Sequence, residues 1–266
     1  MGAEEKERLS RVWSMGDYSL LSKRLEPAAS ELCDACAVSA GQDVLDVAAG
    51  DGNFALACAR EGAHVVACDL APGMVERGRA RSEAEGFDIE WAEADAEELP
   101  FGDESFDCVG SVFGAMIAPR PERVASELFR VVRPGNTVGL TAWVPDGFFV
   151  EMFSIARRFS PPPSGTARSE EWGDEAIVRE RLGGLAAHVQ CERRVLRWEA
   201  ESPAALEREL AESAPTYTAA REGLPSEDYA QLRGETLALL ERSNIAGDGT
   251  LRLEAEYLLT VARKRG

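Results

Sequence analysis

The chain has 266 residues, with 29 lysines and arginines against 47 aspartates and glutamates, which gives a formal net charge of −18. A field of that sign repels phosphate backbones and anionic lipids, so we expect no nucleic-acid or membrane partner and predict a small-molecule one. The charged start and the lack of a long apolar run argue against a signal peptide and a membrane span. The cysteines lie singly apart from Cys33 and Cys36, which favours a reduced, cytoplasmic protein without a metal site. The sequence leaves open whether the protein forms a homodimer.

The first half of the chain changes from a helical to an alternating pattern at Gly41. Apolar side chains at helical spacing predict helices within residues 9–39, with an interruption at Gly16 and Asp17. Beyond them, we expect strands at 44–48, 64–69, 89–94, 106–112 and 137–143, with helices at 53–61, 74–85 and 121–132 between them. Strands that alternate with helices form a parallel sheet with helices on both faces.

The second half is less regular. We expect a helix at 148–158, a proline-rich surface loop at 161–165, a strand at 187–199, a helix from Ser202, a helix at 225–244 and a last strand at 251–262. The last strand is placed antiparallel, at or near the sheet edge. The predicted fold class is therefore α/β, a Rossmann-like, seven-stranded, mostly parallel sheet with an antiparallel last strand. Within one structural domain, we expect a helical lid at 1–40, a ligand-binding core at 41–145, and a helical cover with the last two strands at 146–266.

Features of a nucleoside site occur at three successive strand ends. The strand at 44–48 leads into Gly50 and Gly52, where a Cβ would keep a ligand from the backbone and the turn needs unusual φ and ψ angles. Asp69 ends the next strand, 17 positions beyond Gly52, where a carboxylate can accept both hydroxyls of a ribose. Asp95 ends the third, placed to accept from an adenine amino group. Either aspartate alone could be a helix N-cap, but together they predict a nucleoside site.

The motifs at these strand ends resemble those of the class I methyltransferases that use S-adenosylmethionine (SAM), in particular small-molecule methyltransferases such as those of ubiquinone and menaquinone biosynthesis. The resemblance covers about residues 40–145 well, and it rests on the segments 44–53, 69–74, 94–101, 105–107 and 132–135. It implies SAM as cofactor and S-adenosylhomocysteine (SAH) as product. Two positions depart from the family pattern, since Ala48 and Asn136 stand where glycines are frequent.

The resemblance also implies which residues bind the cofactor. The loop from Asp46 to Gly52 would hold the methionine part, Asp69 the ribose, and Asp95 with its neighbour the edge of the adenine. Leu70 and Met74 would flank the adenine, and the backbone around Ser111 would close the pocket. The full predicted set is Asp46, Ala48, Gly50, Gly52, Asn53, Asp69, Leu70, Met74, Asp95, Ala96 and Ser111.

Two alternatives use the same residues. The spacing Gly50-x-Gly52-x-x-Ala55 also fits an NAD(P)-dependent oxidoreductase, with Asp69 on the NAD ribose. Against it, Asp46 and Asp51 would repel a pyrophosphate, and the three lysines of the chain provide no Tyr-x-x-x-Lys pair. The second alternative is a non-catalytic protein that binds SAM.

A methyltransferase needs little general acid–base catalysis. Methyl transfer from a sulfonium is an in-line displacement, to which positioning of the two reactants can contribute roughly 7–11 kcal/mol. The chain offers no obvious general base, and the weak candidates are Asp17, Asp146, Glu151 and His188. This favours an amine, a carbon nucleophile or an acidic hydroxyl as the methyl acceptor.

Aromatic residues near the carboxyl edge of the predicted sheet suggest an apolar or aromatic small-molecule acceptor. The alternative is that most of them pack the helical cover onto the sheet. The predicted acceptor-pocket residues are Tyr18, Phe113, Met116, Trp143, Phe148, Phe149, Phe153 and Tyr217.

Overall fold

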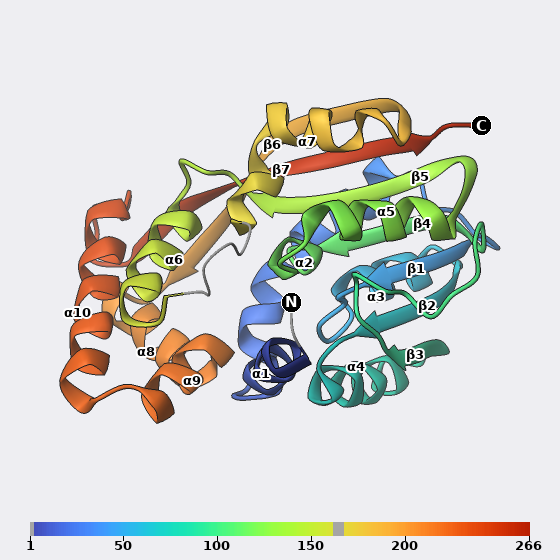
Figure 1. Ribbon diagram of the computed structural model, residues 1–266. Coiled ribbons are helices and arrows are strands. Elements are labelled where there is room, and N and C mark those ends of the chain that lie inside the picture. The colour runs from blue at the N-terminus through green and yellow to red at the C-terminus, as the bar shows by residue number, and fades with distance from the viewer. Residues whose placement is uncertain (1–2, 162–167) are drawn as a thin grey trace.

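The computed structural model describes residues 3–161 and 168–266, and Figure 1 shows one continuous sheet with helices around it. The strands are β1 (Asp43–Val47), β2 (His64–Asp69), β3 (Ile89–Glu93), β4 (Phe106–Val112), β5 (Val132–Trp143), β6 (Ala186–Ala200) and β7 (Leu251–Lys264). Their order is β3-β2-β1-β4-β5-β7-β6, and β7 runs antiparallel to both of its neighbours while the other six are parallel. The predicted fold class is confirmed. Most of the predicted proline-rich loop, at 162–165, lies outside the described residues.

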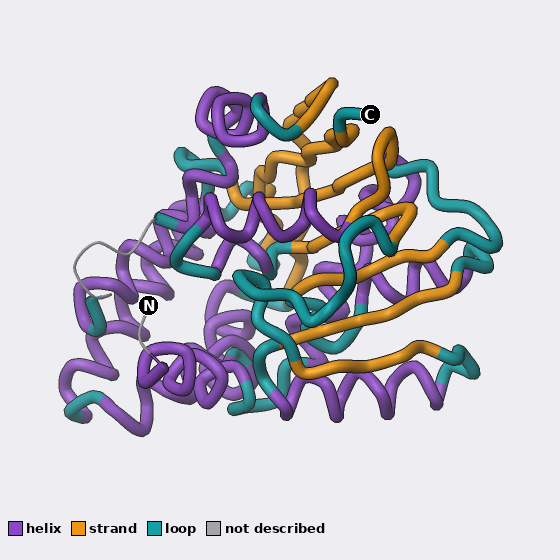
Figure 2. The backbone as a smooth tube through the Cα atoms, turned by 45° about the vertical axis from the view of Figure 1, so that its right-hand side comes forward, coloured by secondary structure: helices purple, strands orange, loops and turns teal. Residues whose placement is uncertain are grey.

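Helices cover the sheet and gather at one of its ends. They are α1 (Ala3–Trp13), α2 (Ser19–Ala35), α3 (Asn53–Arg60), α4 (Pro72–Ala84), α5 (Pro121–Val131), α6 (Phe148–Phe159), α7 (Glu175–Gly183), α8 (Pro203–Ser213), α9 (Pro215–Gly223) and α10 (Ser226–Ser243). In Figure 1, α5 lies across β4 and β5, while α2 and α3 pack together behind the sheet. The carboxyl ends of the parallel strands point toward α1 and toward the group formed by α6, α8, α9 and α10 (Figures 1 and 2).

The central strands are apolar because both faces of the sheet are covered. In β1, Val44, Leu45 and Val47 are completely buried between β2 and β4. Parallel strands buried on both faces carry continuous apolar runs rather than alternating ones. The one polar exception in the last four positions of β1 is Asp46, which is also buried. A carboxylate at such a position needs a functional reason.

The structure departs from the predicted elements in the second half of the chain. Two helices, α7 and α9, were not predicted, and β5 begins at Val132 rather than at Thr137. Helix α7 is short, and it starts where the side chain of Asp174 accepts hydrogen bonds from the backbone N–H groups of Ala176 and Ile177. Because only Val178 and Leu182 of this helix are buried, the spacing of its apolar residues does not predict a helix from the sequence.

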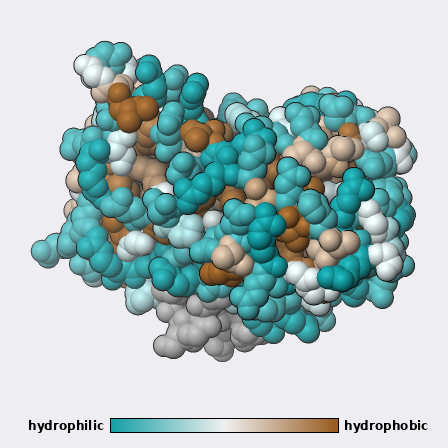
Figure 3. Space-filling view, turned by 90° about the horizontal axis from the view of Figure 1, so that it is seen from above, coloured by the Kyte–Doolittle hydropathy of each residue, from teal (hydrophilic) through white to brown (hydrophobic). Residues whose placement is uncertain are grey.

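The surface agrees with the strongly charged composition. On the face seen in Figure 3, hydrophilic residues predominate and apolar ones occur in small separate groups. Among the side chains that the structure describes, three large apolar ones are exposed, those of Leu20, Val195 and Ile245. Within residues 3–161 and 168–266, no helix is both long and apolar enough to cross a bilayer.

Candidate functional site

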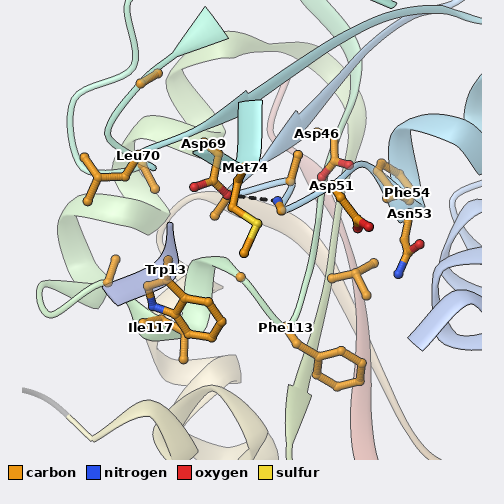
Figure 4. Close-up of a pocket in the computed structure, with 18 of the residues that line it drawn as sticks. Trp13, Asp46, Asp51, Asn53, Phe54, Asp69, Leu70, Met74, Phe113 and Ile117 are labelled. Atoms are coloured by element: carbon orange, nitrogen blue, oxygen red, sulfur yellow. Dashed lines mark hydrogen bonds between the residues drawn. The ribbon is translucent and has the colours of Figure 1, made fainter. Parts of the chain in front are cut away.

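A pocket lies at the carboxyl ends of β1, β2 and β3, where open α/β sheets bind their ligands (Figure 4). It spans about 950 Å³ including the part open to solvent. Of the eleven predicted cofactor-binding residues, the pocket brings together nine: Asp46, Ala48, Gly50, Asn53, Asp69, Leu70, Met74, Asp95 and Ala96. Gly52 and Ser111 lie just outside its lining.

Asp69 joins the second strand to the glycine loop. Its carboxylate accepts hydrogen bonds from the backbone N–H groups of Gly50, at 2.8 Å, and Ala71, at 2.9 Å. The first of these bonds is the dashed line in Figure 4. Burial raises the pKa of Asp69 to about 6, although the backbone donors partly offset the effect. Asp69 therefore lines the pocket and holds the loop in place.

Asp46 carries an unsatisfied buried oxygen. Its Oδ2 accepts a hydrogen bond from the backbone N–H of Ala55 at 2.9 Å, but its Oδ1 has no partner although the residue is only 1% exposed. Burial raises the pKa of Asp46 to about 8, and the negative charges of Asp69 and Asp51 add to the effect. A buried acceptor without a donor is costly, so this oxygen points to a ligand that brings a donor or a positive charge.

A network behind the glycine loop fixes the orientation of Asn53. Its Nδ2 donates to the backbone carbonyl of Ser22 at 2.8 Å, and its Oδ1 accepts from Arg81 at 2.7 Å. Ser22 also donates its hydroxyl hydrogen to Asp51, and Arg81 forms an ion pair with the same carboxylate at 3.3 Å. The amide of Asn53 is thus engaged with α2 and α4, and its side chain positions the loop.

Asp95 is paired with the N-terminal helix. Its Oδ1 accepts the backbone N–H of Glu97 at 2.9 Å, and its Oδ2 accepts from the ammonium of Lys6 on α1. Lys6 also lies 3.6 Å from the fully buried carboxylate of Glu97, which Arg120 holds by three hydrogen bonds of 2.6–2.9 Å. Helix α1 is therefore fastened at the Asp95 end of the pocket.

Comparisons with known proteins agree with this geometry. A family model described as a methyltransferase domain matches residues 44–135, which include all three aspartates at the strand ends. An uncharacterised protein of Mycobacterium tuberculosis is 35% identical over 265 residues, covering 96% of this chain and 93% of that protein. A demethylmenaquinone methyltransferase of Clavibacter sepedonicus is 37% identical over 150 residues, which cover 54% of this chain and 61% of that enzyme.

The chain belongs to the class I SAM-dependent methyltransferases. Its fold also matches a solved structure of Haemonchus contortus phosphoethanolamine N-methyltransferase 2 in complex with SAM, with a TM-score of 0.57 and 19% identity over 90% of this chain and 53% of that one. The predicted enzyme class and SAM as cofactor are confirmed. The NAD(P) alternative is thereby set aside.

This methyltransferase has pocket walls that suit its cofactor. Gly50 and Gly52 have φ angles of +58° and +93°, so the loop can turn sharply beside the ligand. The unpartnered Oδ1 of Asp46 suits the ammonium of the methionyl part of SAM. Ser111 lies beneath the loop, where its hydroxyl donates to the carbonyl of Val47 at 2.6 Å and accepts from the N–H of Ala115 at 2.9 Å.

The pH dependence of SAM binding is the first test of Asp46. With a pKa of about 8, the free carboxyl is mostly protonated at pH 7, whereas an ammonium requires the carboxylate. Binding should therefore release a proton, and affinity should rise up to about tenfold per pH unit between pH 6.5 and 8, then level off. Calorimetry in buffers of different ionisation enthalpy measures this release. In Asp46→Asn the rise should disappear, and an unchanged pH profile in that variant would remove the assignment.

Ala48 adopts a conformation that favours glycine. Its φ angle is +52°, in the left-handed region, at the position where the family often has a glycine. Replacing Ala48 by glycine relieves roughly 1–2 kcal/mol of backbone strain in the folded state. Because glycine also raises the conformational entropy of the unfolded chain, we expect a net stabilisation of about 0.5–1 kcal/mol. This corresponds to a melting temperature raised by about 2–3 °C in a thermal-shift assay. A lower melting temperature for Ala48→Gly would contradict the strain argument.

The predicted acceptor residues separate into two groups. Tyr18 and Phe113 line the pocket, whereas Met116, Trp143, Phe148, Phe149, Phe153 and Tyr217 do not. Trp143 lies between the rings of Phe113 and Phe149, with ring centroids 3.9 and 4.1 Å away. Tyr217 is buried and bonds Thr236 at 2.5 Å. For this second group the packing interpretation describes the structure, because each member belongs to the hydrophobic core or packs against it.

None of the four catalytic candidates lines the pocket. Asp17 is exposed and accepts the N–H of Ser19 at 3.1 Å, Asp146 pairs with Arg193 at 2.7 Å, and Glu151 pairs with Arg242. His188 is exposed on β6. The ion pair with Arg193 holds the pKa of Asp146 below its usual value, which makes it a poorer base still.

The pocket also has apolar walls beyond the predicted cofactor-binding and acceptor residues given above. These residues are Leu9, Trp13, Leu25, Val112, Ile117, Ala118 and Pro119. Leu9 and Trp13 lie four positions apart on α1 and therefore face the same side of that helix. The sequence predicts a helical lid at residues 1–40, but it does not indicate that Leu9 and Trp13 are the side chains of this lid that face the pocket.

Proposed function

We propose that this enzyme transfers a methyl group from SAM to a small, uncharged, apolar or aromatic acceptor. The supporting observation is the composition of the pocket wall opposite the strand ends, where the lining side chains are Leu9, Trp13, Tyr18, Leu25, Phe113, Ile117, Ala118 and Pro119. None of these carries a charge. An acceptor with a buried charge would meet no counterion there, whereas a flat apolar molecule would pack against the aromatic rings.

Each cofactor residue has a role in this proposal. Asp46 accepts the ammonium of the methionyl part, Asp69 accepts the ribose hydroxyls, and Asp95 accepts the adenine amino group. Leu70 and Met74 flank the adenine, with Ala96 at its edge. Residues 1–40 act as a lid and residues 41–145 as the SAM-binding core of the same domain. Residues 146–266 support the acceptor wall from behind, since Phe149 stacks on Trp143, which in turn stacks on Phe113.

We propose that the enzyme accelerates methyl transfer by positioning the two reactants rather than by using a general base. The one titratable side chain among the acceptor-facing residues listed above is Tyr18, and burial raises the pKa of its hydroxyl, so it stays protonated and is a weak base. SAM supplies an activated methyl group, and the pocket's part is to align the acceptor and exclude water. This favours an amine, a carbon nucleophile or an acidic hydroxyl. We place the reaction in the cytoplasm, where the six free cysteines would remain reduced.

The direct test is an acceptor library incubated with the enzyme and SAM and read by mass spectrometry for the gain of one methyl group. The library should contain matched apolar, anionic and cationic molecules, including phenols, anilines and quinols. The relative from Clavibacter sepedonicus, a demethylmenaquinone methyltransferase by name, makes apolar quinols a reasonable starting point. Methylation confined to strongly charged acceptors would contradict the proposal, and SAM binding without turnover on any acceptor would favour a non-catalytic SAM-binding protein.

A change at Trp13 should separate acceptor binding from cofactor binding. In Trp13→Ala the acceptor loses a large aromatic surface, worth about 2–3 kcal/mol, so its KM should rise by about 30-fold or more. The Kd for SAM, measured by calorimetry, should change by less than about threefold. A matched control is Trp172→Phe, which alters a buried tryptophan outside the pocket. If Trp13→Ala weakens SAM binding and leaves the acceptor KM unchanged, Trp13 belongs to the cofactor wall instead.

A further inference from the structure

The loop after β4 begins with a strained residue. Phe113 directly follows β4 and has a φ angle of +55°, in the left-handed region that is disfavoured for a bulky side chain. Ala48 stands at the equivalent position after β1, with its φ angle of +52°. These two strands are neighbours where the strand order of the sheet reverses, which is where α/β sheets bind ligands. Backbone strain persists only where the surroundings enforce it, and it is concentrated at functional sites.

Thr141 holds this strained residue from the neighbouring strand. The backbone N–H of Phe113 donates to the carbonyl oxygen of Thr141 at 3.2 Å and to its side-chain hydroxyl at 3.1 Å. Thr141 lies in β5, opposite Val112 of β4, and is only 3% exposed. Of the two acceptors, the hydroxyl is the one that depends on which side chain stands at position 141. It stabilises Phe113 in its present conformation.

The residues beside Phe113 leave the loop little freedom. A Cβ on Gly114 would lie 2.1 Å from the backbone oxygen of Ala48, so the loops after β1 and β4 are in direct contact. The hydroxyl of Ser111 donates to the end of β1 and accepts the N–H of Ala115 at 2.9 Å. The loop is therefore fixed on both sides of Phe113, and the backbone conformation at that residue decides where its ring lies.

The ring of Phe113 has a firm backing. It stacks on Trp143 with ring centroids 3.9 Å apart, and Tyr257 meets it edge-on at 5.5 Å. Phe149 in turn stacks on Trp143, and all four rings are buried. Figure 4 shows Phe113 on the side of the pocket away from Leu70. Because a close-packed group of rings cannot fully collapse into the space freed by one member, the Phe113 ring sets the limit of the pocket at this wall.

We propose that Phe113 determines the size of the methyl acceptor that the enzyme admits, and that Thr141 is the positioning residue that keeps the Phe113 ring in place. The inference rests on the proposed function, which puts the acceptor against this wall. It goes further by naming the side chain that limits the acceptor and a second residue that acts through it. Thr141 does not itself line the pocket, so its effect on the acceptor is exerted through Phe113.

The test uses two probes that differ by one phenyl ring. We would measure the Kd of phenol and of p-phenylphenol by calorimetry on the enzyme saturated with SAH. The additional ring matches the group that Phe113→Ala removes, so this variant should bind p-phenylphenol more tightly relative to phenol by about tenfold or more. Phe148→Ala makes the same substitution outside the pocket and should leave the ratio of the two Kd values unchanged. An unaltered ratio in Phe113→Ala would overturn the size limit.

A pair of variants isolates the hydroxyl of Thr141. Thr141→Val replaces it by a methyl group of similar size, so the ratio should shift in the same direction as in Phe113→Ala, by about threefold to tenfold. Thr141→Ser keeps the hydroxyl and should behave as the wild type does. In the Phe113→Ala background, Thr141→Val should have no further effect on the ratio, because no ring is left to position. An equal effect in both backgrounds would show that Thr141 does not act through Phe113.

The outcomes separate this inference from the function on which it rests. If the wild-type enzyme binds neither probe, the proposed apolar acceptor is contradicted, and a crystal structure of Thr141→Val then decides the positioning role. In that structure Phe113 should leave the left-handed region, or its ring should move off Trp143, and an unmoved Phe113 would refute the role of Thr141. If Thr141→Val does not fold, the comparison of Phe113→Ala with the wild type decides the size limit.

Discussion

Replacing Asp69 by alanine should lower the affinity for SAM by at least about 100-fold. The carboxylate accepts the backbone N–H groups of Gly50 and Ala71, and in the proposed function it also accepts the ribose hydroxyls. Hydrogen bonds to a charged group are worth about 1.5–3 kcal/mol each, so the loss of two of them accounts for an effect of this size. Calorimetry with SAM measures it directly.

Two further variants control for indirect effects of the Asp69 change. Asp69→Asn keeps the shape but has one acceptor oxygen in place of the two that Gly50 and Ala71 use, so it should lose one of these bonds and about tenfold in affinity. Asp88→Ala removes an exposed carboxylate at the opposite end of β3 and should bind SAM as the wild type does. Unchanged SAM binding in a folded Asp69→Ala variant would remove the ribose assignment.

Replacing Gly78 by alanine should destabilise the protein by about 3 kcal/mol. A Cβ on Gly78 would overlap the ring of Trp91, which is buried and donates its Nε1–H to Ser82 at 3.1 Å. The same ring lies 2.9 Å from where a Cβ on Gly52 would be, so it cannot move aside without displacing the glycine loop. Overpacking of this kind costs about 1–3 kcal/mol, at the upper end where neighbours cannot relax.

Thermal unfolding measures the Gly78 effect as a melting temperature lowered by about 6–12 °C. The matched control is Gly234→Ala, because Gly234 lies exposed within α10 and a Cβ there meets no atom within 4 Å. Alanine suits a helix interior better than glycine does, so this variant should gain about 0.5–1 kcal/mol. The same substitution thus has opposite expected signs at the two sites. A melting temperature within 1 °C of the wild type for Gly78→Ala would refute the packing argument.

The sequence was sufficient to predict the strand ends and the residues there. Asp46, Asp69 and Asp95 each follow or end an apolar run, and parallel strands bring their carboxyl ends to one edge. Local pattern and sheet topology therefore determine this part of the pocket. The unpartnered oxygen of Asp46, in contrast, depends on what surrounds it in three dimensions.

The acceptor side depended on packing that no local pattern encodes. Trp143 ends a strand as Asp69 does, but β7 inserts beside β5 and brings Tyr257 against it, so the ring becomes part of the core. Trp13 faces the pocket because α1 folds back across the strand ends, where Lys6 pairs with Asp95. Both results follow from contacts between residues far apart in the chain, which apolar spacing cannot reveal.

A crystal structure of the enzyme with SAH would show directly whether the ends of β1, β2 and β3 hold one nucleoside cofactor. We expect a donor from the ligand's amino group on Oδ1 of Asp46, ribose hydroxyls on the carboxylate of Asp69, and the adenine amino group near Asp95. A ligand bound elsewhere, or a nucleoside in this pocket that leaves Oδ1 of Asp46 unpaired and Asp69 out of reach of the ribose, would contradict it.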